Sequence, residues 1–105
     1  MLQAARELQA FVTNRLRDDL DDDRMFRLAA ERAVEIIGVA ASRVSQDFRA
    51  AHPEVPWQGV IGQRNVIAHE YGDIILDRLW VVATERIPEL IRLLEPLIPP
   101  PPEEP

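Results

Sequence analysis

Residues 24–50 read RMFRLAAERAVEIIGVAASRVSQDFRA and decide the fold, because apolar side chains recur there every three or four residues. This spacing gathers them on one face of a helix, and its many alanines let a neighbouring helix pack closely. The apolar positions that we expect to form much of the core are Phe26, Ala29, Ala33, Ile36, Ile37, Ala40, Val44 and Phe48. The helical period and the scarcity of glycine, with four in the chain, predict an all-α protein.

Upstream, the same spacing predicts a first amphipathic helix over residues 2–17, with apolar positions at Leu2, Ala5, Leu8, Val12 and Leu16. The aspartate-rich run at 18–23 suits a loop and the start of the next helix, where negative charge meets the helix dipole. A calcium loop is the alternative reading. It would put Arg24 where the loop needs glycine and Ala30 where it needs a bidentate glutamate, so we reject it.

Downstream, prolines make residues 51–57 a connection, with Pro56 placed to open the next helix and His52 an ordinary loop histidine. A third helix is predicted over residues 57–71, followed by Gly72 as a left-handed cap and Asp73 as the cap of a fourth helix.

Pro88 either kinks the fourth helix or starts a last one, which Pro96 ends. Residues 99–105 are too rich in proline for a helix and are expected to be extended or disordered. The chain therefore divides into a bundle of four to five helices, residues 1–98, and a proline-rich tail, residues 99–105.

The composition excludes several classes of protein. With 105 residues the chain is one domain, and its net charge of −6 argues against nonspecific coating of nucleic acid, so any contact with RNA must be local. The absence of cysteine removes disulfides, thiolate metal sites and cysteine nucleophiles, which fits a reducing cytoplasm. Neither a membrane-spanning stretch nor a signal peptide is visible, so we expect a soluble, cytoplasmic protein.

Residues 64–71, RNVIAHEY, hold the strongest candidates for chemistry, Arg64 and His69. A guanidinium fits a phosphate and an imidazole exchanges protons near neutral pH, a pairing that suits phosphodiester chemistry. His69 would move a proton during attack of a ribose 2′-hydroxyl on phosphorus, Arg64 would stabilise phosphoryl charge, and Asn65 would orient the imidazole or bind phosphate. Such a reaction needs no cofactor or metal ion. A surface cation and a satisfied helix histidine remain the plainer interpretation of the same two residues.

A single helix does not close such a site. Positions 64 and 69 are about 140° apart around a helix axis, whereas Asn65 and His69 share a face and Arg64 lines up with Tyr71. A homodimer would supply a second motif at a shared cleft around a two-fold axis, so we expect dimerisation through the motif helices.

The motif, an arginine followed after four residues by His69 and then by Tyr71, resembles the signature of HepT-like members of the HEPN superfamily. The similarity extends upstream to residues 33–38 and 40–41, to Val55-Pro56-Trp57 and to Gly62. Downstream it includes Asp73, Trp80 and residues 87–90, so that it covers roughly residues 8–98. One departure is Val39, where the family often has a glutamate; Glu35 or Asp47 are the acids that could replace it.

The resemblance implies a HEPN-type bundle that dimerises and acts as a metal-independent endoribonuclease, the toxin of a toxin-antitoxin pair. It implies catalytic roles for Arg64 and His69 and an accessory polar role for Asn65. It also implies a partner, an MntA-like nucleotidyltransferase antitoxin that silences the toxin by transferring AMP to Tyr71, where bulk and negative charge would compete for Arg64. Two alternatives stay open, a noncatalytic dimer that serves the nucleotidyltransferase as an interaction subunit and a nucleotide-binding domain.

Overall fold

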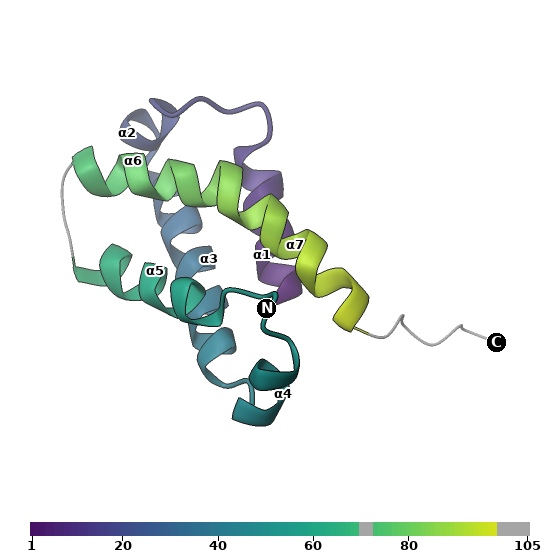
Figure 1. The fold of residues 1–105 in the computed structure, drawn as a ribbon. Helices are drawn as coiled ribbons and strands as arrows, with labels where there is room; N and C mark the ends of the chain where they lie inside the picture. Colours follow the sequence, from purple (N-terminus) through teal and green to yellow (C-terminus); the bar gives the residue numbers. More distant parts are fainter. Residues whose placement is uncertain (70–72, 99–105) are drawn as a thin grey trace.

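The computed structural model describes the backbone of residues 1–69 and 73–98, and the side chains of residues 1–63 and 75–98. This part of the chain is helical without any strand, which confirms the all-α prediction (Figure 1). Its five helices of eight or more residues are α1 (Leu2–Val12), α3 (Arg24–Ser42), α5 (Trp57–His69), α6 (Asp73–Val81) and α7 (Ile87–Leu94). Shorter segments are α2 (Asp19–Asp22), α4 (Gln46–Ala51), the π-helix η1 (Val82–Arg86) and the 3-10 helix η2 (Glu95–Leu97).

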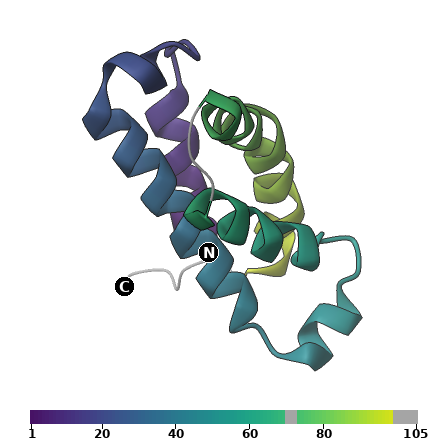
Figure 2. The ribbon, with the colours of Figure 1, turned by 90° about the vertical axis from the view of Figure 1, so that its left-hand side faces the viewer.

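Helix α3 is the centre of the packing. It lies against α1 on one side and α5 on the other, while α7 crosses α1 (Figures 1 and 2). One continuous core joins these helices. Among its most deeply buried members are Ala5, Leu8, Ala30, Ala41 and Leu79. Burial of these apolar groups is the main force that holds the helices together.

The first helix is shorter than predicted, since α1 ends at Val12 and not at residue 17. Asn14 adopts a left-handed conformation with a φ of 63°, which an α-helix does not accommodate and which asparagine tolerates better than most residues. Leu16 is consequently 72% exposed, so its predicted place on the apolar face is wrong.

The long helix predicted over residues 24–50 is in fact two helices, α3 and α4. Helix α3 ends at Ser42, and Ser45 has an extended backbone that begins a new helix. Its side chain caps α4 by accepting a hydrogen bond from the Phe48 backbone N–H over 3.1 Å. Phe26, Ala33 and Ile37 are buried as predicted. Ile36 and Phe48, in contrast, are 41% and 39% exposed, which corrects their assignment to the core.

Helices α6 and α7 form a single rod, joined by η1 (Figure 1). Pro88 has no N–H to donate, and its ring disfavours the regular register of the preceding turn. The chain widens there instead: the Ile87 N–H donates to the Val82 carbonyl five residues back, and the Thr84 hydroxyl donates to the Trp80 carbonyl over 2.7 Å. Pro88 thus opens α7 without breaking the rod.

Candidate functional site

Helix α5 carries the motif positions Arg64, Asn65 and His69 on one unbroken α-helix, as predicted from the sequence. Because the helix is regular, positions 64 and 69 are about 140° apart around its axis, so the backbone of one chain does not bring them to one side. The side chains of these three residues, and Tyr71 altogether, lie outside the described residues.

The start of α5 is fixed by its aromatic first residue. Trp57 and Val55 are buried, and the Trp57 indole Nε1 donates to the His52 carbonyl over 3.0 Å. His52 therefore supports this turn with its backbone, while its Nδ1 lies 3.1 Å from Glu54 Oε1 and its ring lies against Phe48. The prediction of a structural loop histidine fits this position, one residue beyond the end of α4.

The helix that follows the motif, α6, is attached by an arginine far away in the sequence. Arg17 donates from Nε to Asp77 Oδ1 over 2.6 Å and also pairs with Asp21 in α2. The hydrogen bond that Arg17 donates to Asp77, more than the attraction of Asp21, raises the pKa of Arg17 above its ordinary value. This network ties the aspartate-rich segment to α6.

Two further aspartates of residues 18–23, Asp19 and Asp23, have structural partners. Asp23 accepts from the Phe26 N–H and caps α3, as predicted, and Asp19 accepts from the Leu16 N–H over 2.8 Å. The hydrogen bond from Phe26 and the nearby Arg15 guanidinium lower the pKa of Asp23. In the part of the chain that the structure describes, no three His, Cys, Asp or Glu residues are grouped as ligands for a metal ion.

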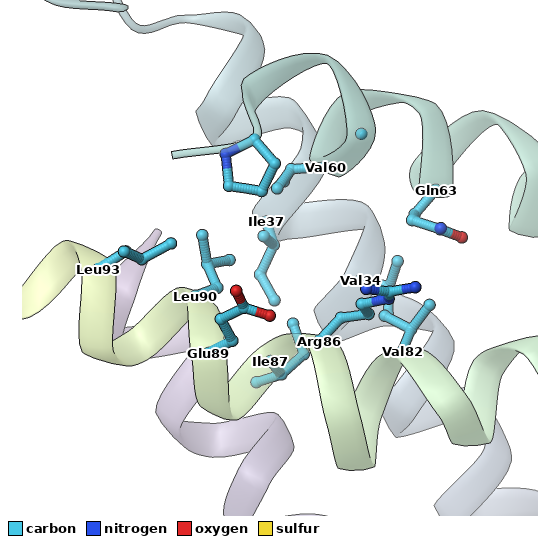
Figure 3. A pocket seen from close by; sticks show the side chains of 12 residues that line it. Val34, Ile37, Val60, Gln63, Val82, Arg86, Ile87, Glu89, Leu90 and Leu93 are labelled. Atoms are coloured by element: carbon cyan, nitrogen blue, oxygen red, sulfur yellow. The ribbon is translucent and has the colours of Figure 1, made fainter. Parts of the chain in front are cut away.

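A pocket of about 390 Å³ lies between α5 and the η1–α7 part of the rod, with Val34 and Ile37 of α3 at its base (Figure 3). Most of its lining is aliphatic. The polar side chains on its walls are Gln63, Arg86 and Glu89. Gln63 directly precedes Arg64 on α5, so the pocket adjoins the motif in the chain.

Gln63 has a buried acceptor, because its Oε1 is shielded from solvent and has no hydrogen-bond partner among the described residues. Figure 3 shows Gln63 on the α5 wall, with Arg86 reaching into the pocket from the opposite wall. Arg86 is exposed and forms no ion pair with a described residue. Sequence reasoning missed this group because Gln63 precedes Arg86 by 23 residues and Glu89 by 26, too far for a motif spacing to connect them.

No helix in the described parts of the chain is both long and apolar enough to cross a lipid bilayer.

Two acids are considered as substitutes for the family glutamate. Glu35 pairs with Arg32 over 3.2 Å on the exposed side of α3, and Asp47 lies exposed in the first turn of α4.

Comparison with known proteins gives one consistent family. The family described as "Ribonuclease HepT-like" matches residues 1–97. "Putative RNase MJ1380" of Methanocaldococcus jannaschii is 33% identical over 95 residues, which cover 90% of this chain and 87% of the relative. "Probable ribonuclease HepT" of Thermococcus cleftensis is 32% identical over 88 residues, 84% of this chain and 80% of the relative.

A more distant relative, "Putative RNase MJ0127" of Methanocaldococcus jannaschii, is 26% identical over 93% of this chain and 81% of its own length. No solved structure matches the chain significantly. The family match spans nearly all of the described helices, and two relatives above 30% identity agree with it. The chain therefore belongs to the HepT-like ribonuclease family.

Proposed function

We propose that this protein is a metal-independent endoribonuclease that acts as a homodimer in the cytoplasm, as the toxin of a toxin-antitoxin pair. The observation that carries the proposal is the single helix α5, which bears Arg64, Asn65 and His69 in a chain of the HepT-like ribonuclease family. Names of the relatives, which include "Probable ribonuclease HepT", support RNA as the substrate.

The proposed reaction is a transesterification within RNA. A ribose 2′-oxygen attacks the adjacent phosphorus while His69 accepts the hydroxyl proton, and the bond to the 5′-oxygen breaks as that oxygen takes up a proton from water. Arg64 stabilises the charge on the phosphoryl oxygens, and Asn65 orients the imidazole or binds a phosphate oxygen. The products carry a 2′,3′-cyclic phosphate and a 5′-hydroxyl.

The helix geometry supports the proposed dimer. Positions 64 and 69 are about 140° apart around the axis of α5, so the two groups would meet at one phosphate most readily if a second copy of the helix supplied one of them. Two α5 helices packed around a two-fold axis would place Arg64 of one protomer near His69 of its partner. Activity should therefore fall with dilution below the dissociation constant of the dimer.

Regulation is proposed at Tyr71. A partner nucleotidyltransferase, MntA-like, would join the tyrosine oxygen to the α-phosphorus of ATP, with pyrophosphate leaving. The attached AMP adds bulk and negative charge two residues beyond His69, where it competes with RNA for Arg64. Mass spectrometry of the chain after incubation with such an enzyme and ATP would find one or more AMP units on Tyr71, and Tyr71→Phe would abolish them.

The test of catalysis is cleavage of total RNA by purified protein in the presence of a chelator. His69→Ala and Arg64→Ala should each remove cleavage, and the wild type should leave 2′,3′-cyclic phosphate ends. The matched controls are His52→Ala and Arg43→Ala, which remove the same residue types away from the C-terminal end of α5 and should keep activity. Cleavage that survives in His69→Ala, or that disappears equally in His52→Ala, would contradict the proposed roles.

A further inference from the structure

The pocket between α5 and the η1–α7 segment has the make-up of a site for a small ligand. Its volume of about 390 Å³ falls within the usual range of about 300–1,000 Å³ for such sites. Aliphatic side chains line both walls, among them Val60 on α5, Val82 on η1 and Leu90 on α7 (Figure 3). Two walls of this kind accept a flat, weakly polar ring.

Gln63 supplies the polar group that a ring edge needs. Its Oε1 is buried and has no donor within the described parts of the chain, and an unpaired buried acceptor is unfavourable. The terminal amide turns easily about its last torsion angle, so either the oxygen or the NH2 group can face the pocket. Turned so that Oε1 faces the pocket, the amide would accept a hydrogen bond from an N–H group at the edge of a heterocyclic ring.

Arg86 and Glu89 define the rest of the ligand. Arg86 enters the pocket from η1 and forms no ion pair with a described residue, so its guanidinium is available for a phosphate (Figure 3). Glu89 follows one helical turn later and offers a carboxylate that accepts hydrogen bonds from sugar hydroxyls. A ring with N–H groups, vicinal hydroxyls and a phosphate together make a ribonucleotide.

We propose that this pocket binds one ribonucleotide, with the base between Val60 and Leu90 and hydrogen-bonded to Gln63, the phosphate on Arg86 and the ribose hydroxyls on Glu89. Since Gln63 adjoins Arg64 on α5, the nucleotide is a neighbour of the scissile linkage in the RNA chain, and this assignment rests on the proposed ribonuclease function. The carboxylate of Glu89 favours ribose over deoxyribose, because only ribose has the 2′-hydroxyl.

The experiment is a titration of the full chain with ligands, in which the methyl NMR signals of valine and leucine report binding. AMP represents a free nucleotide, dAMP lacks the 2′-hydroxyl, inorganic phosphate lacks the base, and a hexaadenylate added to the His69→Ala variant represents RNA. We expect signals of Val60, Val82 and Leu90 to shift with AMP and hexaadenylate, more weakly with dAMP, and not with phosphate. Tighter binding of hexaadenylate than of AMP would assign the site to RNA, and the reverse would assign it to a free nucleotide and overturn the subsite.

Variants separate binding in this pocket from binding elsewhere. Gln63→Leu should raise the Kd about tenfold, the loss of one hydrogen bond, and Arg86→Gln should raise it about tenfold and flatten its dependence on salt. Arg92→Gln and Glu85→Gln change the same charges at exposed positions outside the pocket and should leave the Kd unchanged. Val60→Trp, which fills the pocket, should abolish binding.

Three results would overturn the proposal: methyl shifts confined to residues outside the pocket, equal weakening by Arg92→Gln and Arg86→Gln, or unchanged affinity in a folded Val60→Trp protein. Shifts of the pocket signals that depend on protein concentration alone would mean that a second copy of the chain fills it, which also refutes the proposal. If the protein binds nucleotide but does not cleave RNA, the proposed ribonuclease function and the placement of the nucleotide beside the scissile linkage are refuted, whereas the nucleotide-binding pocket stands. Intact cleavage without binding would refute the pocket alone.

Discussion

Arg17 and Asp77 are hydrogen-bonded across 60 residues of sequence, with Nε of Arg17 donating to Oδ1 of Asp77 over 2.6 Å. Both side chains lie at the surface, and such exposed pairs contribute little to global stability. Their effect is local, because they hold α6, the helix that follows the motif, against the segment before α2.

Asp77→Asn should therefore loosen α6 without unfolding the protein. We expect faster amide hydrogen exchange along Asp73–Val81 and a nearly unchanged urea midpoint, because the core that buries α6 stays intact. Arg32→Gln breaks the ion pair between Arg32 and Glu35 within α3 and should leave exchange in α6 unaltered. Equally slow amide hydrogen exchange along α6 in the wild type and in Asp77→Asn would rule out this attachment.

Leu79 and Leu16 should respond very differently to truncation. Leu79 is 1% exposed and Leu16 is 72% exposed. Leu79→Ala should lower the free energy of unfolding by about 2–5 kcal/mol, since it leaves a cavity in the core. Leu16→Ala should change it by less than about 0.5 kcal/mol in denaturant titrations. A large loss of unfolding free energy in Leu16→Ala would show that Leu16 is packed against other residues after all.

Gly62 lowers the stability of α5, and the residues that the structure describes give no packing reason for a glycine there. A Cβ built at this position meets nothing within 4 Å, and glycine inside a helix is less favourable than alanine. Gly62→Ala should raise the free energy of unfolding by about 0.5–1 kcal/mol in thermal or urea titrations.

The same methyl group should weaken self-association, because our proposed dimer brings two α5 helices together near the motif. Sedimentation velocity over a dilution series would measure this effect. The control is Gly59→Ala, whose added Cβ would make only ordinary contact with Pro56 at 3.9 Å. A Gly62→Ala dimer as tight as the wild type would remove Gly62 from the interface.

Asp23 should make stability depend on acidity. Its pKa in the folded state is lowered by the Phe26 N–H and by Arg15, so its carboxylate stabilises the fold above its unfolded-state pKa. That contribution is lost as the pH falls through the folded value, below the ordinary 3.8. Urea midpoints at pH 7 and pH 2.5 should differ less in Asp23→Asn than in wild type. Asp22→Asn, one residue away, should retain the wild-type difference.

Sequence periodicity found the helices but not all of their ends. The apolar pattern around Phe26 and Ile37 located α3, and the proline before Trp57 located the start of α5. The pattern failed at Asn14 and Ser45, where a left-handed backbone and a side-chain cap override helical propensity. Such local competitors carry little signal in a periodicity count.

The candidate site, too, was predictable from the sequence only in part. A contiguous motif identified Arg64, Asn65 and His69, and the structure places all three on α5 as the spacing predicted. Gln63 and Arg86 line one pocket only because α5 packs on α3 while η1 and α7 pack on α1, which itself lies against α3. Tertiary packing of this kind leaves no trace in the spacing of the two residues.

The π-helix between α6 and α7 also has an evolutionary consequence. Its wider turn takes up one extra residue, so Leu79 before it and Leu90 after it both remain in the core. A homologue that lost one residue within Val82–Arg86 could run a regular helix there and keep the same interior. Alignments of this family should therefore permit a one-residue gap in the middle of this rod, and not only in the loops.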